Sequence, residues 1–225
     1  RTLKNLTHVE GMSLEAMQAG IDWDFVTFPE YMDSLDRRGL VPNVAAFCGH
    51  SSVRTWVLGD DASDRAATKD EVAEMKVLVR EAMDAGACGF ATSTLEQHNG
   101  DNGIPMPSRL ADEHEMMELT GAMGDAGKGA FMLTKGMKTT VPWLESIAAN
   151  NGRPVMIAAM FIDPGDPERV FREVGQIEEA RARGRELWSQ VGCFALGMEF
   201  NLEHPYPLEA LITWHRAIEA EGTED

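Results

Sequence analysis

Short apolar segments alternate along the chain with longer amphipathic segments, and this alternation predicts the architecture. The predicted strands are Val41–Cys48, Ala87–Thr92, Gly129–Leu133, Pro154–Phe161 and Leu187–Phe194. Apolar residues in these segments are nearly continuous, which is typical of parallel strands that are covered on both faces.

The amphipathic segments between the strands are predicted helices, and several begin with a recognisable cap. Thr27, Thr68 and Asp112 each precede a glutamate by three positions, as in a capping box. Further helices are predicted at 139–150, 166–183 and 208–221. Strand and helix therefore alternate about every 35–40 residues, which predicts an α/β fold with a parallel sheet. An open doubly wound sheet and a (β/α)8 barrel both fit this pattern, and the chain would form roughly two-thirds of such a barrel.

Polar residues gather directly after the first predicted strand, in the segment VPNVAAFCGHSSVR. The apolar residues stop at Gly49, and His50, Ser51 and Arg54 follow in a predicted loop that extends to Ala67. Site residues of α/β enzymes lie at the carboxyl ends of parallel strands, so these side chains are candidates for a site. The alternative is a turn whose polar groups cap the next segment.

The next two strands also end in candidate site residues. Ser93 and Thr94 follow the second strand, and His98 lies in the long loop after them, between residues 95 and 110. A patternless loop of this length is often a binding loop or a lid. Lys135 follows the third strand. It could neutralise a developing oxyanion or form a Schiff base, or it could lie clear of the site.

Composition and short motifs argue against several classes of function. The net charge of −17 argues against nucleic-acid binding, which needs clustered Lys and Arg. The chain contains no apolar run of the roughly 18 residues that cross a membrane. The three cysteines are separated and lack CxxC spacing, which favours buried thiols in a reducing, cytoplasmic compartment. No GxGxxG or P-loop motif follows a strand. Because the chain begins at Arg1 and ends in an acidic segment, we expect a fragment of a longer protein.

At this point the motifs resemble a known family. NVAAFCGHSSVR, the helix and strand TKDEVAEMKVLVREAMDAGACGFATST, His98 and PMPSRLADEHEMMEL resemble the N-acyl-D-amino-acid deacylase (D-aminoacylase) branch of the amidohydrolase superfamily. The resemblance covers residues 23–127 and is looser beyond them. It implies that residues 1–225 are part of a single catalytic domain, a partial (β/α)8 TIM-type barrel. It also implies a zinc-dependent hydrolase that acts on the amide of N-acylated amino acids, a small-molecule partner.

The chain departs from the family pattern at the metal site. The family carries an HxH near the first barrel strand, and no HxH occurs here. It also carries metal-binding histidines at the ends of two later strands, where this chain has Leu133-Thr134-Lys135 and Ala158-Ala159-Met160. We therefore expect an altered metal site whose zinc ligands lie mostly outside this chain, and we assign no metal ligand within it.

The strand-end positions and the family resemblance together predict catalytic and substrate-binding roles for individual residues. Lys135 and His50 are the predicted catalytic residues, and Arg54 is predicted to hold the substrate carboxylate as a bidentate partner. For Arg54, a surface ion pair with Asp60 or Asp61 is the alternative. Further predicted substrate-binding residues are Ser51, Ser93, Thr94 and His98. Glu199 and His204 could form an acid–base pair, or lie in an exposed loop. Two other functions stay open: a metal-free barrel lyase that uses Lys135, and a non-catalytic ligand-binding barrel.

Overall fold

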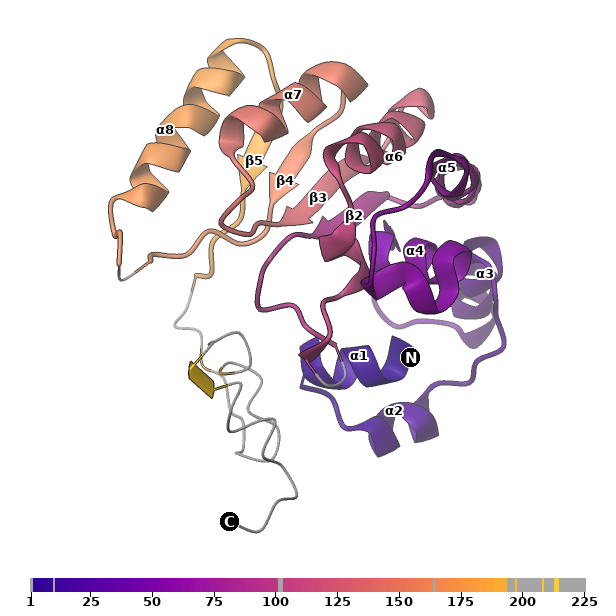
Figure 1. The fold of residues 1–225 in the computed structure, drawn as a ribbon. Coiled ribbons are helices and arrows are strands. Elements are labelled where there is room, and N and C mark those ends of the chain that lie inside the picture. Colours follow the sequence, from indigo (N-terminus) through magenta and orange to yellow (C-terminus); the bar gives the residue numbers. More distant parts are fainter. Residues whose placement is uncertain are drawn as a thin grey trace, which may run out of the picture.

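The computed structural model describes residues 2–9, 11–100, 103–163, 165–193, 197, 208 and 213–214. Its strands are β1 (Phe47–Gly49), β2 (Gly89–Ser93), β3 (Ala130–Thr134), β4 (Val155–Ile157) and β5 (Leu187–Ser189). They form one parallel sheet in the order β1-β2-β3-β4-β5, as Figure 1 shows for β2 to β5. A doubly wound sheet reverses its strand order at a switch point, whereas here every strand pairs with its neighbour in sequence. The predicted α/β fold and partial barrel are therefore confirmed, and the doubly wound alternative is wrong.

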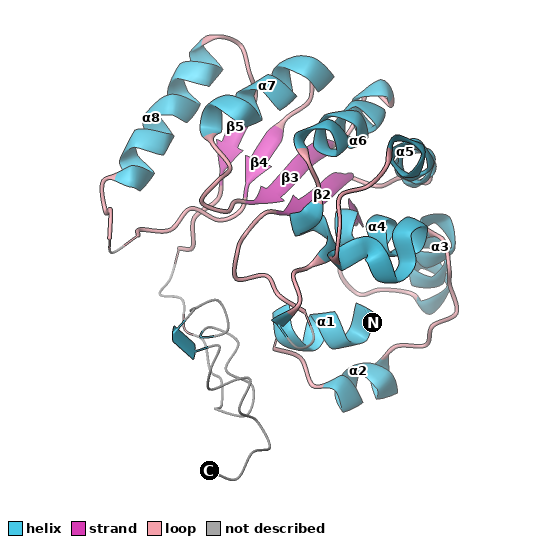
Figure 2. Cartoon of the chain, viewed as in Figure 1, coloured by secondary structure: helices cyan, strands magenta, loops and turns pink. Residues whose placement is uncertain are grey.

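A layer of helices covers one face of this sheet. The helices that directly precede β2, β3, β4 and β5 along the chain are α5 (Lys69–Asp84), α6 (Glu113–Asp125), α7 (Val141–Asn151) and α8 (Arg169–Ala182). Figure 2 shows these four helices in an arc outside the sheet. The helices before them are α1 (Thr2–Val9), α2 (Leu14–Gly20), α3 (Phe28–Arg38) and α4 (His50–Leu58). In the described part of the chain, no helix combines the length and apolar character that crossing a membrane requires.

The hydrophobic core lies between the sheet and this helical layer. Phe90 of β2 stacks on Phe131 of β3, with ring centroids 6.1 Å apart, and both side chains are fully buried. Leu119 of α6 and Leu144 of α7 are also fully buried in this cluster. Burying such a side chain contributes about 1.5–3 kcal/mol. This packing aligns the strands, so that their carboxyl ends meet at one edge of the sheet.

The predicted helix starts are confirmed where a side-chain cap defines them. Thr27 with Glu30 and Thr68 with Glu71 form complete capping boxes at α3 and α5. The carboxylate of Asp112 accepts the backbone N–H of Glu115 and caps α6. These contacts are local, and each satisfies N–H groups that a helix start leaves unpaired.

The first strand is shorter than predicted, and a helix takes the place of the loop that was predicted after it. Only residues 47–49 pair with β2, while Val41 is fully exposed and Val44 is about half exposed. In the described part of the chain, β1 is an edge strand with β2 as its one neighbour. Residues 41–45 therefore have no strand on their other side to pair with, and they stay out of the sheet. Helix α4 begins at His50, immediately after the strand, where a loop was expected. Spacing of four residues then places His50 and Arg54 on the same helical face.

Other elements agree in type and differ in length. Strands β2 and β3 each begin and end one or two residues later than predicted, and β4 and β5 are limited to three residues each. Most of the predicted helix at 208–221, and both Glu199 and His204, lie outside the described residues.

Candidate functional site at the carboxyl end of the sheet

A buried cluster of polar and charged side chains joins α4 to α6 and includes Thr92, near the end of β2. Glu115 accepts a hydrogen bond from His50 Nε2 at 2.6 Å and forms an ion pair with Arg54. The hydroxyl of Thr92 contacts His50 Nδ1 at 2.8 Å. The second terminal nitrogen of Arg54 donates to the carbonyls of Ala62 and Arg65, at 3.3 and 2.8 Å. Arg54, Glu115 and His50 are all at most 1% exposed.

Burial and pairing set the protonation of this cluster. Burial lowers the pKa of His50, although the neighbouring Glu115 opposes the shift. Burial raises the pKa of Glu115, but the hydrogen bonds and charges of His50 and Arg54 outweigh it and lower that pKa overall. A carboxylate can only accept, so the neutral imidazole carries its proton on Nε2 and accepts the Thr92 hydroxyl proton at Nδ1.

This geometry gives Arg54 a partner that neither sequence-based alternative named. Its ion-pair partner is Glu115, 61 residues along the chain, and not Asp60 or Asp61. The guanidinium is enclosed by protein atoms. The predicted contacts of Arg54 with a substrate carboxylate and of His50 with reacting atoms stay predictions.

The predicted residues Ser51, Ser93 and His98 lie close together at the edge of the sheet. Ser93 Oγ lies 2.6 Å from His98 Nδ1. Ser108, which sequence reasoning missed, joins the two strand ends. Its hydroxyl donates to the Ser93 carbonyl at 2.9 Å, and its backbone N–H donates to Ser51 Oγ at 3.2 Å. No local sequence pattern marks Ser108, because its two partners lie 15 and 57 residues away.

Thr94 ties the ends of β2 and β3 together. Its hydroxyl accepts the backbone N–H of Gly136 at 3.0 Å and contacts the hydroxyl of Thr139 at 2.7 Å. A Cβ at Gly136 would lie 2.1 Å from the Thr94 carbonyl oxygen, so this close approach requires glycine.

Lys135 lies near this edge but pairs with the helical layer. Its ammonium contacts Glu173 of α8 at 2.9 Å, and the side chain is 8% exposed. Arg169 flanks the pair and forms an ion pair with Asp163 at 3.2 Å. In this arrangement the ammonium of Lys135 is held by a carboxylate from a helix rather than extended into open space.

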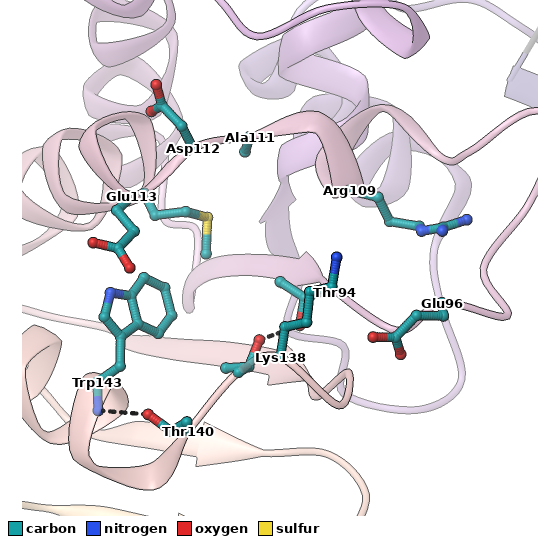
Figure 3. Close-up of a pocket in the computed structure, with 11 residues that line it drawn as sticks. Thr94, Glu96, Arg109, Ala111, Asp112, Glu113, Lys138, Thr140 and Trp143 are labelled. Atoms are coloured by element: carbon teal, nitrogen blue, oxygen red, sulfur yellow. Dashed lines mark hydrogen bonds between the residues drawn. The ribbon is translucent and has the colours of Figure 1, made fainter.

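A cavity of about 440 Å³ lies beside Thr94, between the first turns of α6 and α7. Its lining includes the indole of Trp143 and two cations, Arg109 and Lys138. Three acids also line it: Glu96, Asp112 and Glu113. Figure 3 shows Glu113 beside the Trp143 ring, with Lys138 close to Thr94. Arg109 is already bonded to Asn99 and to the His98 carbonyl, whereas Lys138 has no hydrogen-bond or ion-pair partner among the described residues. The cavity therefore offers one uncommitted cation.

The described residues do not fit a zinc ion by themselves. Within the described ranges, no three His, Cys, Asp or Glu side chains converge on a position that could hold a metal ion. The ends of β3 and β4 carry Thr134, Lys135 and Ala158 instead. Zinc sites in proteins need at least three such ligands.

The chain is similar in sequence to several bacterial proteins. It is 38% identical to D-aminoacylase of Alcaligenes xylosoxydans xylosoxydans over 82 residues, which are 36% of this chain and 16% of that enzyme. It is 39% identical to N-acyl-D-aspartate deacylase of the same organism over 71 residues, 32% of this chain and 14% of that enzyme. An uncharacterised protein of Mycobacterium tuberculosis is 33% identical over 122 residues, 51% of this chain and 20% of that protein. No family model matches the chain.

Solved structures extend this likeness to the fold. A D-aminoacylase structure that defines a novel subset of amidohydrolases matches with a TM-score of 0.61 and 25% identity, over 74% of this chain and 34% of that one. An N-acyl-D-glutamate deacylase from Bordetella bronchiseptica, solved with zinc and a phosphonate inhibitor, matches with a TM-score of 0.60 and 22% identity, over 72% and 33%. The resemblance to D-aminoacylases predicted from the sequence is confirmed. The chain spans only a small part of these relatives.

Proposed function

We propose that the whole protein hydrolyses the amide bond of an N-acylated amino acid. The observation that carries this proposal is the joint similarity to D-aminoacylase, 38% identity over 82 residues and a TM-score of 0.61. A cavity and several hydroxyl groups at the carboxyl edge of the sheet support it, because enzymes with this fold bind substrate there.

The substrate class follows from the chemistry of the edge. An N-acylated amino acid has lost the positive charge of its amino group and keeps the negative charge of its α-carboxylate. Lys138 at the cavity is an uncommitted cation, so we propose that it holds this carboxylate, a role that sequence reasoning gave to Arg54. Ser51, Ser93, Thr94 and His98 are proposed to line the substrate side of the edge, as substrate-binding residues. The proposed catalytic roles of Lys135 and His50 rest on their positions after strand ends.

Zinc is the proposed cofactor of the whole protein. D-aminoacylase has a binuclear metal centre, and the deacylase of Bordetella bronchiseptica binds zinc in its solved complex. The described residues do not form such a site, so the ligands would come mostly from outside this chain. When bound, zinc polarises a carbonyl and activates water.

The remaining proposals concern the cellular location, the partners and the two alternative functions. We propose a cytoplasmic protein that acts on a small molecule; the free cysteines of the described residues support a reducing compartment. The acidic charge supports the absence of a nucleic-acid partner. The similarity to deacylases does not favour a metal-free lyase built on Lys135 or a non-catalytic barrel.

The test is an assay of free amino acid released by the zinc-loaded full-length protein. Its substrates are N-acetyl amino acids of both chiralities, each beside its uncharged carboxamide. Lys138→Ala should raise KM about tenfold for the carboxylates and leave the carboxamides unchanged, because a charge-assisted contact is lost. Lys128→Ala is the matched control, since Lys128 is an exposed lysine just before β3, at the opposite edge of the sheet. Failure to hydrolyse any of these compounds would refute the proposed function.

A further inference from the structure

Ser93 and His98 form a contact that could support catalysis and that has no catalytic role so far. Ser93 Oγ and His98 Nδ1 are 2.6 Å apart, within the range expected for a nucleophile and its general base. Both side chains are partly exposed, and Ser93 directly precedes Thr94, which lines the cavity. Other serines at this edge make different contacts: the Ser108 hydroxyl donates to a carbonyl, and Ser51 Oγ accepts a backbone N–H.

The pair is held in place from both sides. Ser93 belongs to β2, where it is paired in register with Thr134 of β3. His98 is fixed through its backbone: its N–H donates to the Leu95 carbonyl at 3.0 Å, and its own carbonyl accepts from Met106 N at 3.1 Å. Arg109 donates to the same carbonyl at 3.2 Å. A rigid strand and a pinned loop thus preorganise the two reacting groups, which effective catalysis requires.

Protonation also suits a general base. Burial lowers the pKa of His98, and the positive charge of Arg109 lowers it further. The imidazole is therefore neutral at pH 7, and in the tautomer that carries its proton on Nε2, Nδ1 accepts from the serine hydroxyl. The backbone N–H of Leu95 donates to Ser93 Oγ at 3.2 Å, so the hydroxyl accepts this hydrogen bond and keeps its own proton to donate to His98.

We propose that Ser93 and His98 form a nucleophile–base pair that accepts acyl groups from small activated esters. Ser93 Oγ attacks the carbonyl carbon as His98 Nδ1 takes the hydroxyl proton. The C–O bond then breaks, and His98 returns the proton to the departing alcohol. Water attacks the acyl-serine, which releases the carboxylic acid and restores the hydroxyl. This reactivity is separate from the proposed zinc-dependent amide hydrolysis.

A fluorophosphonate probe tests this reactivity on the full-length protein, with the labelled residue located by peptide mass spectrometry. We expect covalent label on Ser93, lost in Ser93→Ala and slowed about 100-fold or more in His98→Gln, which keeps a polar side chain but cannot take the proton. Ser146→Ala is the control, because Ser146 is an exposed helical serine that donates to the Trp143 carbonyl. It should label like the parent protein.

The pH dependence of labelling provides a readout that survives if the His98 variant fails to fold. Because the pKa of His98 is lowered from 6.5, the labelling rate should reach half of its high-pH value only below pH 6.5. Absence of label on Ser93, or equal labelling in folded His98→Gln, would overturn the proposal. Amide hydrolysis without labelling would refute the pair alone. Labelling without hydrolysis of any N-acetyl amino acid would refute the proposed function alone.

Discussion

Neutralising Glu115 should destabilise the protein strongly. In Glu115→Gln, the side chain keeps its size, but the Arg54 guanidinium stays buried without a counter-charge. Arg54 is fully enclosed, and its remaining described acceptors are the carbonyls of Ala62 and Arg65. Removing one partner of a buried ion pair costs about 3–5 kcal/mol. Glutamine has a single carbonyl oxygen, which can accept from Arg54 while its amide donates to His50 in the other tautomer. We therefore expect the lower end of this range, about 3 kcal/mol.

The assay is denaturant unfolding of the full-length protein, with Glu118→Gln as the matched control. Glu118 lies on the same helix and pairs with Lys76 at the surface, where its side chain is 38% exposed. An exposed pair of this kind is worth below about 1 kcal/mol. If the two variants unfold alike, the buried cluster does not stabilise the fold as argued. Arg54→Ala should also lower stability; a higher KM with unchanged stability would instead support substrate binding by Arg54.

The remaining predictions concern pH, backbone contact and metal. The lowered pKa of His50 means that the unfolded chain binds its proton first, so stability should decline as pH falls below 6.5; His50→Asn should flatten this decline in a pH series of unfolding curves, and the exposed-site variant His114→Asn should not. Gly136→Ala should lower the Tm and disturb the Thr94 contact, whereas Gly121→Ala, where a Cβ meets nothing within 4 Å, should be neutral or stabilising. A chelator should abolish amide hydrolysis by the full-length protein and added zinc should restore it; hydrolysis that resists chelation would refute the proposed cofactor.

The helix starts were predictable from sequence alone because their determinants are local. At α3 and α5, the cap and the glutamate that completes it are three residues apart, so the hydrogen bonds form within one turn. The order of helices and strands followed from similar local patterns of apolar residues. These patterns could not choose between a doubly wound sheet and a barrel, because strand order is a property of the assembled sheet.

Tertiary structure decided what the polar residues do. The segment before Phe47 reads as a strand, yet it has no second neighbour in the described sheet and stays exposed. Ser93, Thr94 and His98 were predictable as site candidates because they follow a strand, but not the contacts that join them to other strand ends. The partner of Arg54 was not predictable either, since Glu115 is 61 residues away and looks like an ordinary acid in the first turn of a helix. Sequence spacing determines which residues share a helical face, whereas the packing of α6 against α4 and β2 decides which charges are removed from water and must therefore pair.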